Sequence, residues 1–343
     1  MNPNIPEKYQ AIVLPDYNPN FIRAMLSMKI EEKKMRQPQK DEVLVKMIAS
    51  PCNPSDIAFM QGGYNIKKEV PVVPGFEGAG LVVATGDSPE AVRLKGRRLS
   101  CFTQNQEDGT WGEYFITAAG NCIPLRDDLP DEEAAVFGIN PFTAYGLFEK
   151  ARLNKSTAII QNAAGSQVSN FVRKLAAKGK VEVIDIVRKE KTQKELVKQG
   201  AKHVLNSSAD DFADKLKDLA HLLNATTALD AVSGEMTGVL YNAMPPGSEV
   251  IVYGGLAGKP AYGMDVLDII FKNKIISGFN LGDYIKNTGP ERFQEISEEL
   301  QQMLIAGDLK TQIRGRFPLE KYVDALKSYL GNMSEGKILL VNE

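Results

Sequence analysis

Apolar and polar positions alternate in short segments over the first third of the chain. Val43, Val45 and Met47 are spaced two residues apart within 42–49, which is the period of a half-buried β-strand. Other short β-rich stretches, separated by turn residues, lie at 9–14, 78–86, 97–102 and 112–117. We therefore expect residues 9–125 to form a β-barrel or sandwich with loops.

From about residue 130 the pattern changes to short apolar strands that alternate with helices. Strands are expected at 157–161, 181–187, 203–206, 228–232 and 249–255, and helices at 131–151, 169–178, 190–200, 210–223 and 236–244. This alternation predicts a parallel sheet with helices on both faces, the doubly wound arrangement that binds nucleotides. The end of the chain returns to two helices, 290–307 and 318–330, and a final strand, 337–341.

Length and charge narrow the class of protein. With 343 residues the chain is about twice the length of a typical domain, so two domains are expected. A net charge of -2 gives no general attraction to nucleic acid or to anionic membranes. No apolar run approaches the ~18 residues of a membrane span, and residues 1–10 lack the features of a signal peptide. We expect a cytoplasmic protein that binds neither nucleic acid nor membrane.

Cysteine usage is sparse. Cys52, Cys101 and Cys122 are odd in number and form no Cys-x-x-Cys pair, so neither a disulfide framework nor a zinc knuckle is indicated. A reducing compartment fits this pattern.

The segment 161–169 follows the first strand of the expected parallel sheet, where a dinucleotide pyrophosphate would bind. It contains one glycine, Gly165, in place of the Gly-x-Gly-x-x-Gly pattern, although its small residues allow close backbone approach. The candidate cofactor-binding residues here are Asn162, Ala163, Gly165, Ser166, Gln167 and Val168. The alternative is an unrelated strand-to-helix turn.

The end of the second strand indicates which dinucleotide would bind. Asp185 lies 20 residues after Gly165, as an NAD-binding acid would, but it is in the middle of its strand. Arg188 and Lys189 lie at the turn, where cations would bind a 2′-phosphate, which favours NADPH. The alternative is that these two cations only solvate the start of a helix.

Eleven segments together resemble, in order, the zinc-free branch of the medium-chain dehydrogenase/reductase superfamily. This branch comprises the quinone oxidoreductase-like proteins and the 2-enoyl thioester reductases. The segments are 53–64, 71–86, 109–115, 140–146, 161–168, 186–190, 200–206, 228–234, 243–255, 269–279 and 336–340. Their QGGY, NPFTAY, QNA and IVR sequences look more like the enoyl thioester reductases.

The resemblance implies an α/β fold in which a Rossmann domain, 128–280, is inserted into a β-rich GroES-like catalytic domain, 1–127 and 281–343. It also places the phosphate-binding cation at Arg188. The positions that match zinc ligands of the alcohol dehydrogenases are Asn53 and Phe76, and the four-cysteine lobe is missing. Neither Asn nor Phe is a normal zinc ligand, so no metal is expected.

Tyr64 and Asn53 are the candidate catalytic residues. By resemblance, Tyr64 matches a tyrosine used near the substrate, and a tyrosine hydroxyl can donate a hydrogen bond or pass a proton. The alternative is that its ring only packs on the barrel. Asn53 would hydrogen-bond the substrate carbonyl or a ribose, or else cap the helix that follows.

Further cofactor-binding residues follow from the resemblance. Thr143 matches a residue against the nicotinamide, and Phe279 to Leu281 match a stretch whose backbone holds the carboxamide. Tyr253, Gly254 and Gly255 lie at the carboxyl end of a predicted strand, where the cofactor must pass. Lys337 looks like the family's lysine that reaches the cofactor, although a solvated lysine would fit as well.

These expectations define an NADPH-dependent oxidoreductase that transfers hydride to an activated C=C bond, in a 2-enoyl thioester or an enone, or to a quinone. The small electrophilic substrate is its expected partner, and the resemblance implies a homodimer. The alternatives are a dedicated NADPH:quinone reductase and a non-catalytic NADPH-binding homologue. Kinship with the enoyl thioester reductases would allow a mitochondrial address, although residues 1–20 contain one Lys and no Arg.

Overall fold

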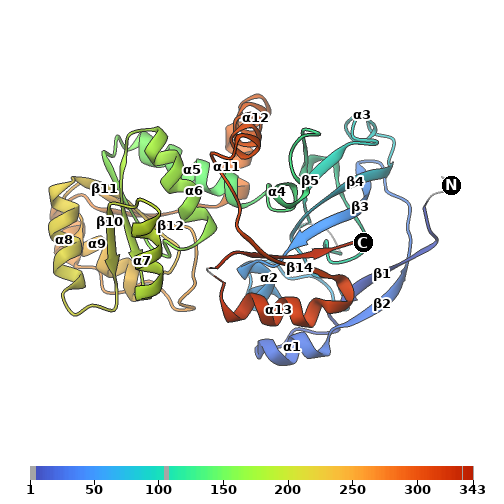
Figure 1. The fold of residues 1–343 in the computed structure, drawn as a ribbon, viewed down its shortest axis with the longest axis horizontal. Coiled ribbons are helices and arrows are strands. Elements are labelled where there is room, and N and C mark those ends of the chain that lie inside the picture. Colours follow the sequence, from blue (N-terminus) through green and yellow to red (C-terminus); the bar gives the residue numbers. More distant parts are fainter. Residues whose placement is uncertain (1–4, 104–107, 334, 343) are drawn as a thin grey trace. The chain divides into compact units, whose positions relative to one another are not determined.

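The computed structural model describes residues 5–103, 108–333 and 335–342. The chain forms two compact units (Figure 1). Unit 1 comprises the residues up to Ile139 and those from Ser297 onward, and unit 2 comprises Asn140–Ile296. No helix within the described ranges combines the length and the apolar character needed to cross a membrane.

Unit 2 contains a six-stranded sheet in which all neighbouring strands are parallel. Its strands are β8 (Ala158–Gln161), β9 (Glu182–Val187), β10 (His203–Asn206), β11 (Ala225–Asp230), β12 (Glu249–Val252) and β13 (Ile275–Gly278). Their order, β10-β9-β8-β11-β12-β13, reverses direction between β8 and β11. This is the doubly wound order of dinucleotide-binding sheets, so the predicted parallel sheet is confirmed.

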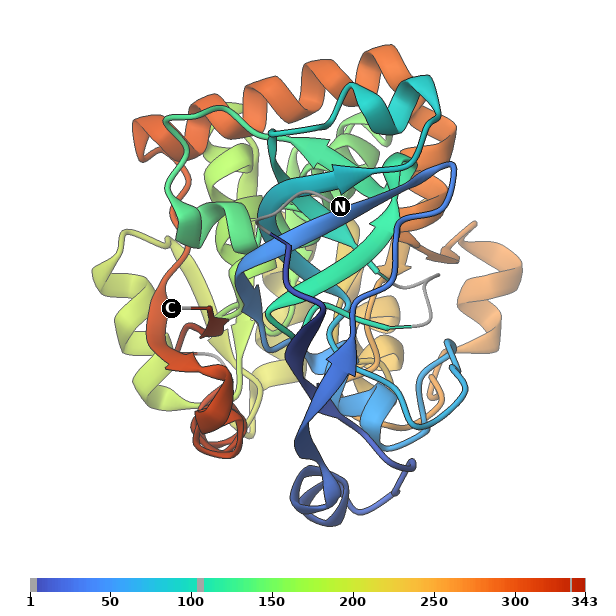
Figure 2. The ribbon, with the colours of Figure 1, turned by 90° about the vertical axis from the view of Figure 1, so that its right-hand side faces the viewer.

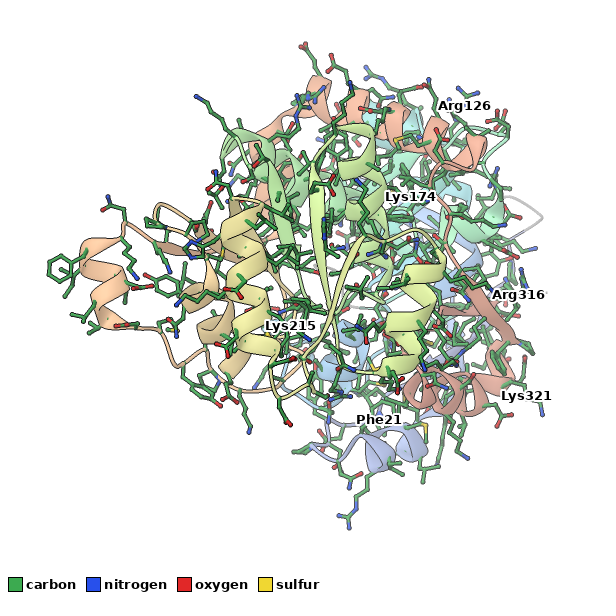
Figure 3. The ribbon with its side chains drawn as sticks, turned by 60° about the vertical axis from the view of Figure 1, so that its left-hand side comes forward. Phe21, Arg126, Lys174, Lys215, Arg316 and Lys321 are labelled. Carbon is green, nitrogen blue, oxygen red and sulfur yellow. The ribbon has the colours of Figure 1, made fainter. Side chains whose placement is uncertain are left out.

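Helices cover both faces of this sheet. The helices of unit 2 are α5 (Asn140–Leu153), α6 (Gln167–Lys178), α7 (Glu190–Lys198), α8 (Phe212–Leu222), α9 (Glu235–Ala243), α10 (Val266–Phe271) and α11 (Leu281–Thr288). Ile184 and Ile186 of β9 pack in one apolar cluster with residues of α8 and α9. Asp185 lies between them and points to the opposite face, because side chains alternate along a strand. On that face it meets Arg173 of α6. Figure 3 labels Lys174 on α6 and Lys215 on α8, both exposed.

Unit 1 is rich in β-structure. Its strands are β1 (Lys8–Val13), β2 (Lys29–Lys34), β3 (Glu42–Pro51), β4 (Glu77–Thr85), β5 (Arg98–Phe102), β6 (Tyr114–Ala118), β7 (Cys122–Pro124), β14 (Ile313–Pro318) and β15 (Lys337–Val341). β1 and β2 form an antiparallel pair, and the others form a sheet of order β14-β15-β3-β4-β5-β7, with β6 also paired to β3. The fully buried Trp111, Phe76 and Phe115 lie in its core.

Short helices surround the sheet of unit 1. They are α1 (Phe21–Ser27), α2 (Pro54–Met60), α3 (Pro89–Val92), α4 (Asp131–Ala135) and α13 (Tyr322–Gly331), with 3₁₀ turns at Ala119–Asn121 and Leu319–Lys321. In Figure 2, α1 lies beyond one end of β2. Helix α12 (Pro290–Ala306) begins in unit 2 and ends in unit 1.

The division between the units falls later in the chain than the expected boundaries at 127/128 and 280/281. Helix α4 packs on β3 and β4 of unit 1, and α11 packs on α5 of unit 2. The helix expected at 131–151 is two helices, α4 and α5, separated by residues 136–139. The polar strand β2 and the edge strand β13 had no strand prediction, because neither alternates as a half-buried strand does.

Candidate active site

The predicted cofactor-binding residues of unit 2 gather mainly at the carboxyl ends of the parallel strands. Asn162 to Val168 follow β8, Arg188 and Lys189 follow β9, Tyr253 to Gly255 follow β12, and Phe279 to Leu281 follow β13. The carboxyl ends of parallel strands lie at one edge of a sheet, and ligands of such sheets bind there, at the point where the strand order reverses.

The loop between β8 and α6 has the backbone of an anion site. Ser166 is the N-cap of α6, and its side chain accepts a hydrogen bond from the Ser169 amide. Ala163 has a φ of +47°, in the left-handed region that non-glycine residues seldom adopt. Helix α6 is 12 residues long, so its first amides and its dipole favour a negative charge at Gly165 to Val168.

Asn162 joins the ends of β8 and β11. Its amide donates to the Asp230 carboxylate at 2.6 Å and accepts from the Ala231 amide at 2.8 Å. Asp230 also accepts from the Val232 and Ser233 amides and from the Thr237 hydroxyl. Both ends of the Asn162 amide are therefore occupied within the protein. Its contribution to this site is to hold the two strand ends together.

Tyr253 directly follows β12, at the same edge of the sheet. Its hydroxyl hydrogen-bonds the side chains of Ser169 and Ser166, and burial raises the pKa of Tyr253 to about 12. Gly254 is required here because a Cβ atom would lie 2.7 Å from the Ala231 carbonyl oxygen. Gly255 is exposed.

The end of β9 carries two exposed cations, Arg188 and Lys189. Lys189 is the N-cap residue of α7. Asp185 is 1% exposed and pairs with Arg173 at 2.6 Å, and it also accepts from the Gln161 amide at 2.7 Å. Because Asp185 is committed to this internal pair, it is not presented to a ribose hydroxyl.

Thr143 and Phe279 lie in a packed part of unit 2. Thr143 is 8% exposed in the first turn of α5, and Phe279 is 9% exposed after β13. The Phe279 amide donates to the Val252 carbonyl at 2.9 Å. The Phe279 ring packs on Gly146, where an added Cβ atom would lie 2.7 Å from the ring. Leu281 is the first residue of α11.

In unit 1 the predicted residues Asn53 and Lys337 lie together in a buried charged cluster. The Lys337 ammonium donates to the Asn53 side-chain oxygen, and the Asn53 amide donates to the Glu77 carboxylate at 3.1 Å. Lys337 is 7% exposed, Asn53 is 3% exposed and Glu77 is fully buried. Asn53 is also the N-cap residue of α2, as the second of its two proposed roles requires. Contact with a substrate or a ribose would have to compete with its internal contacts to Lys337 and Glu77. Lys337 is a buried internal cation, not a solvated surface lysine.

Two buried acids that the sequence analysis did not single out complete this cluster. Asp56 accepts from the amides of Asn53 at 2.8 Å and Phe76 at 3.1 Å, and burial raises the pKa of Asp56 to about 7. Glu77 accepts from the Ile139 amide at 2.8 Å. Burial raises the pKa of Glu77, which the nearby Lys337 opposes, and burial lowers the pKa of Lys337. Asp56 lies three residues after Asn53, and Glu77 directly follows Phe76. Their closeness to these two candidate positions is the sequence signal that could have identified them.

Tyr64, Phe76 and Phe59 form a row of contacting rings in unit 1, here called the aromatic wall. The half-buried ring of Tyr64 lies 5.3 Å from that of Phe76, which in turn lies 5.1 Å from Phe59. The Lys68 ammonium lies 5.3 Å from the Phe76 ring and donates to the Thr103 carbonyl, and burial lowers the pKa of Lys68 to about 8. Lys68 was not among the candidate residues predicted from the sequence.

The zinc chemistry of related dehydrogenases requires several nitrogen, sulfur or oxygen ligands in one place. Within the residues the structure describes, no group of three or more His, Cys, Asp or Glu side chains could hold a metal ion. Asn53 and Phe76 stand where the alcohol dehydrogenases have zinc ligands, and Phe76 is an apolar side chain in the aromatic wall. The donor set does not fit zinc.

The doubly wound parallel sheet of unit 2 and the β-rich unit 1 together define an α/β fold of the dinucleotide-binding class. The family described as "Alcohol dehydrogenase GroES-like domain" matches residues 39–127, and "Zinc-binding dehydrogenase" matches residues 168–302. The chain belongs to the medium-chain dehydrogenase/reductase superfamily.

Comparison with individual proteins shows which members of the superfamily this chain is similar to. The mitochondrial enoyl-[acyl-carrier-protein] reductase of Bos taurus is 32% identical over 291 residues, which are 83% of this chain and 77% of that protein. The Homo sapiens protein of the same name is 30% identical over 87% of this chain and 80% of its own. A Mesorhizobium loti structure, provisionally assigned as an NADPH:quinone reductase, has a TM-score of 0.92 and 30% identity, covering 99% of this chain and all of that one.

The buried cluster predicts a pH-dependent stability defect. Lys337→Met leaves Glu77 and Asp56 without their cation, so the free energy of unfolding should fall by about 3 kcal/mol at neutral pH. Both acids have raised pKa values in the folded protein. The loss caused by removing the cation therefore appears as the two acids ionise, that is, as pH rises through their raised folded pKa values. Denaturant titrations should show a smaller loss near pH 5 than near pH 8.

The matched control is Glu77→Gln combined with Lys337→Met. If the two groups compensate each other, the double variant should lose at least about 1 kcal/mol less than the sum of the single variants. Additive losses that do not change with pH would contradict the charge compensation.

Proposed function

We propose that this protein is an NADPH-dependent, zinc-independent reductase that transfers hydride to the activated C=C bond of a 2-enoyl thioester or an enone. The observation that carries the proposal is the half-buried Tyr64 on an aromatic wall whose neighbouring residues offer no set of metal ligands. Support comes from relatives at 30–32% identity that are named enoyl-[acyl-carrier-protein] reductases.

Arg188 and Lys189 support NADPH over NADH. Both are exposed at the end of β9, where a 2′-phosphate would lie, and guanidinium groups bind phosphate oxygens in bidentate fashion. Asp185, the acid that would favour NADH, is held by Arg173. The first amides of α6, from Gly165 to Val168, would bind the pyrophosphate. The absence of a side chain at Gly254 lets the β12 end pack against the Ala231 carbonyl.

The bound cofactor would supply a hydride, and side chains of the protein must stabilise the charge that develops on the substrate. Hydride addition at the β-carbon leaves an enolate. The Tyr64 hydroxyl donates a hydrogen bond to the enolate oxygen or delivers the proton to the α-carbon. Buried contacts with Glu77 and Lys337 fix the Asn53 side chain. We therefore assign Asn53 the role of holding Glu77 and Lys337 in place.

Quinone reduction is the second candidate. It is favoured by the likeness to the Mesorhizobium loti protein over almost the whole chain. A quinone accepts hydride without a dedicated acid, so the two candidates place different demands on Tyr64. A cofactor-binding protein without catalysis would show neither activity.

Replacing Arg188 tests the cofactor assignment. Arg188→Ala should weaken NADPH binding about 10- to 100-fold and leave NADH binding unchanged, because only NADPH carries the 2′-phosphate. Calorimetric or fluorescence titration gives both dissociation constants. Lys194→Ala is the control, since Lys194 is an exposed cation of α7 that pairs with Glu190. Equal losses for both cofactors would argue against a phosphate site at Arg188.

Replacing the Tyr64 hydroxyl separates the two candidate reactions. Tyr64→Phe should lower kcat for a medium-chain 2-enoyl-CoA about 100-fold or more, and should change quinone reduction by less than about twofold. NADPH oxidation at 340 nm, with EDTA present, measures both rates. Tyr114→Phe, in β6 of the same unit, should leave both unchanged. Parallel losses in both reactions would refute the role of Tyr64 as donor.

We also propose that the protein is a homodimer joined through β13. This strand is the edge of the unit 2 sheet, and Ile275 and Ile276 on it are 57% and 37% exposed. The adjoining α10 exposes Val266, Leu267, Ile269, Ile270 and Phe271. It lies at the margin of unit 2 in Figure 3. Parallel sheets are normally covered, and a bare apolar edge promotes pairing. A two-fold axis would pair β13 with its copy and cover both sets of side chains.

Charges on this edge should dissociate the dimer. Ile275→Asp with Phe271→Asp should convert a species of twice the chain mass into a monomer in sedimentation velocity. Leu222→Asp is the control, because Leu222 is 79% exposed on α8 away from the β13 edge. A wild-type monomer, or a dimer that survives the double substitution, would contradict the β13 interface.

The cytoplasmic location expected from the sequence stays a prediction. Several curated relatives carry the word mitochondrial in their names. Cell fractionation would decide between the two compartments.

A further inference from the structure

Two of the three cysteines face each other on neighbouring strands of unit 1. Cys101 of β5 pairs in register with Cys122 of β7, and their sulfur atoms lie 3.8 Å apart. Both are free thiols in the structure. They are 21 residues apart in the sequence, and nothing in the candidate active site uses either of them.

The strand register suits a covalent bond between them. The Leu125 amide donates to the Arg98 carbonyl at 3.0 Å, so this pair is hydrogen-bonded, and the next position, Leu99 opposite Pro124, is not. Hydrogen-bonded and non-hydrogen-bonded pairs alternate along an antiparallel ladder, which makes Cys101 and Cys122 a non-hydrogen-bonded pair. The Cα atoms of such pairs are about 4.5 Å apart, at the short end of the ~4.4–6.8 Å range of disulfides.

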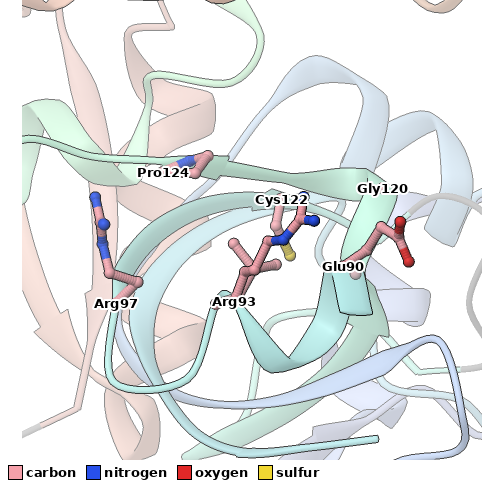
Figure 4. Close-up of a pocket in the computed structure, with 8 residues that line it drawn as sticks. Glu90, Arg93, Arg97, Gly120, Cys122 and Pro124 are labelled. Atoms are coloured by element: carbon pink, nitrogen blue, oxygen red, sulfur yellow. The ribbon is translucent and has the colours of Figure 1, made fainter. Parts of the chain in front are cut away.

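The two thiols differ in access. Cys122 is half-buried and lines a cavity of about 400 Å³ together with Arg93, Arg97 and Glu90 (Figure 4). The cavity is completed by Leu94, Ala119, Gly120 and Pro124. Cys101 is fully buried and does not line the cavity, and Cys52 is fully buried as well. A small oxidant in this cavity therefore meets Cys122 first.

We propose that Cys101 and Cys122 form a reversible dithiol–disulfide pair that is oxidised by hydroperoxides, with Cys122 as the attacking thiol and Cys101 as the resolving thiol. The pair is reduced in a reducing compartment and oxidised under peroxide stress. This is a modification site separate from the NADPH and substrate sites.

The reaction has two steps. The Cys122 sulfur attacks one peroxide oxygen, the O–O bond breaks, and an alcohol or water leaves, which gives a sulfenic acid on Cys122. The Cys101 sulfur then attacks the Cys122 sulfur, the S–O bond breaks, and water leaves as the S–S bond forms. Overall, two thiols lose two electrons and two protons, and one hydroperoxide is reduced to an alcohol, or to water, plus water.

Burial supports this order of reaction. It raises the pKa of the Cys101 thiol well above its ordinary range, and the neighbouring Cys122 thiol adds to the shift. The thiolate is the reactive form, so Cys101 is a poor first target. It needs only the adjacent Cys122 sulfur as its partner.

The sequence makes the product simple to detect. No Lys or Arg lies between Arg98 and Arg126, so trypsin releases both cysteines on the single peptide 99–126. The full-length protein would be treated with hydrogen peroxide, alkylated with iodoacetamide under denaturing, non-reducing conditions, digested and analysed by mass spectrometry. We expect this peptide to lack both alkyl groups and two hydrogens relative to the dithiol, and dithiothreitol to restore alkylation. Cys52 should remain fully alkylated as the internal control.

Two variants test the assigned roles. In Cys101→Ser, a dimedone adduct should accumulate on Cys122, because the resolving thiol is gone. In Cys122→Ser, Cys101 should stay reduced at the same peroxide dose. The proposal is overturned if wild-type Cys122 passes to sulfinic acid without forming the disulfide, or if Cys101 oxidises equally fast in Cys122→Ser. Circular dichroism would verify that both variants are folded.

Discussion

The parallel sheet of unit 2 imposes the geometric constraint on which the cofactor site depends. All six strands run the same way, so the loops after β8, β9, β12 and β13 emerge at one edge. The Asn162 amide holds the β8 and β11 ends together through Asp230, and Tyr253 joins the β12 end to Ser166 and Ser169. These polar contacts fix the loop around Gly165, while Arg188 and Lys189 remain exposed beside it.

Buried acids with dedicated partners recur in both units. Asp230 accepts from backbone amides and Asn162, Asp185 pairs with Arg173, and Glu77 lies with Asn53 and Lys337. A buried carboxylate is costly unless its hydrogen bonds and charge are satisfied, so each acid fixes the position of the elements around it. In unit 1, the sequence resemblance aligns Asn53 of this cluster with a zinc ligand of the alcohol dehydrogenases. The proposed zinc-independent reaction depends on a hydrogen-bond donor, for which Tyr64 is our candidate.

Local sequence patterns predicted much of the fold. Features that depend on contacts between distant parts of the sequence could not be predicted. Strand β3 was predicted from the alternation at Val43 and Val45, because alternate side chains of a strand lie on the same face. Strand β9 was predicted from the apolar run 181–187. The position of Asp185 in the middle of its strand already argued against a ribose contact. The pairing of Lys337 with Asn53 spans 284 residues, and no local pattern reports such a contact. β2 and β13 were missed because one is polar and the other lies at an edge.

The account depends most on hydride transfer from NADPH to carbon. The most direct measurement uses wild-type protein with NADPH deuterated at the transferring C4 position and a medium-chain 2-enoyl-CoA, followed by NMR of the product. The account predicts deuterium at the carbon β to the thioester carbonyl and a solvent proton at the α-carbon. A saturated product without deuterium at the β-carbon, or no saturated product while a quinone is reduced, would contradict it.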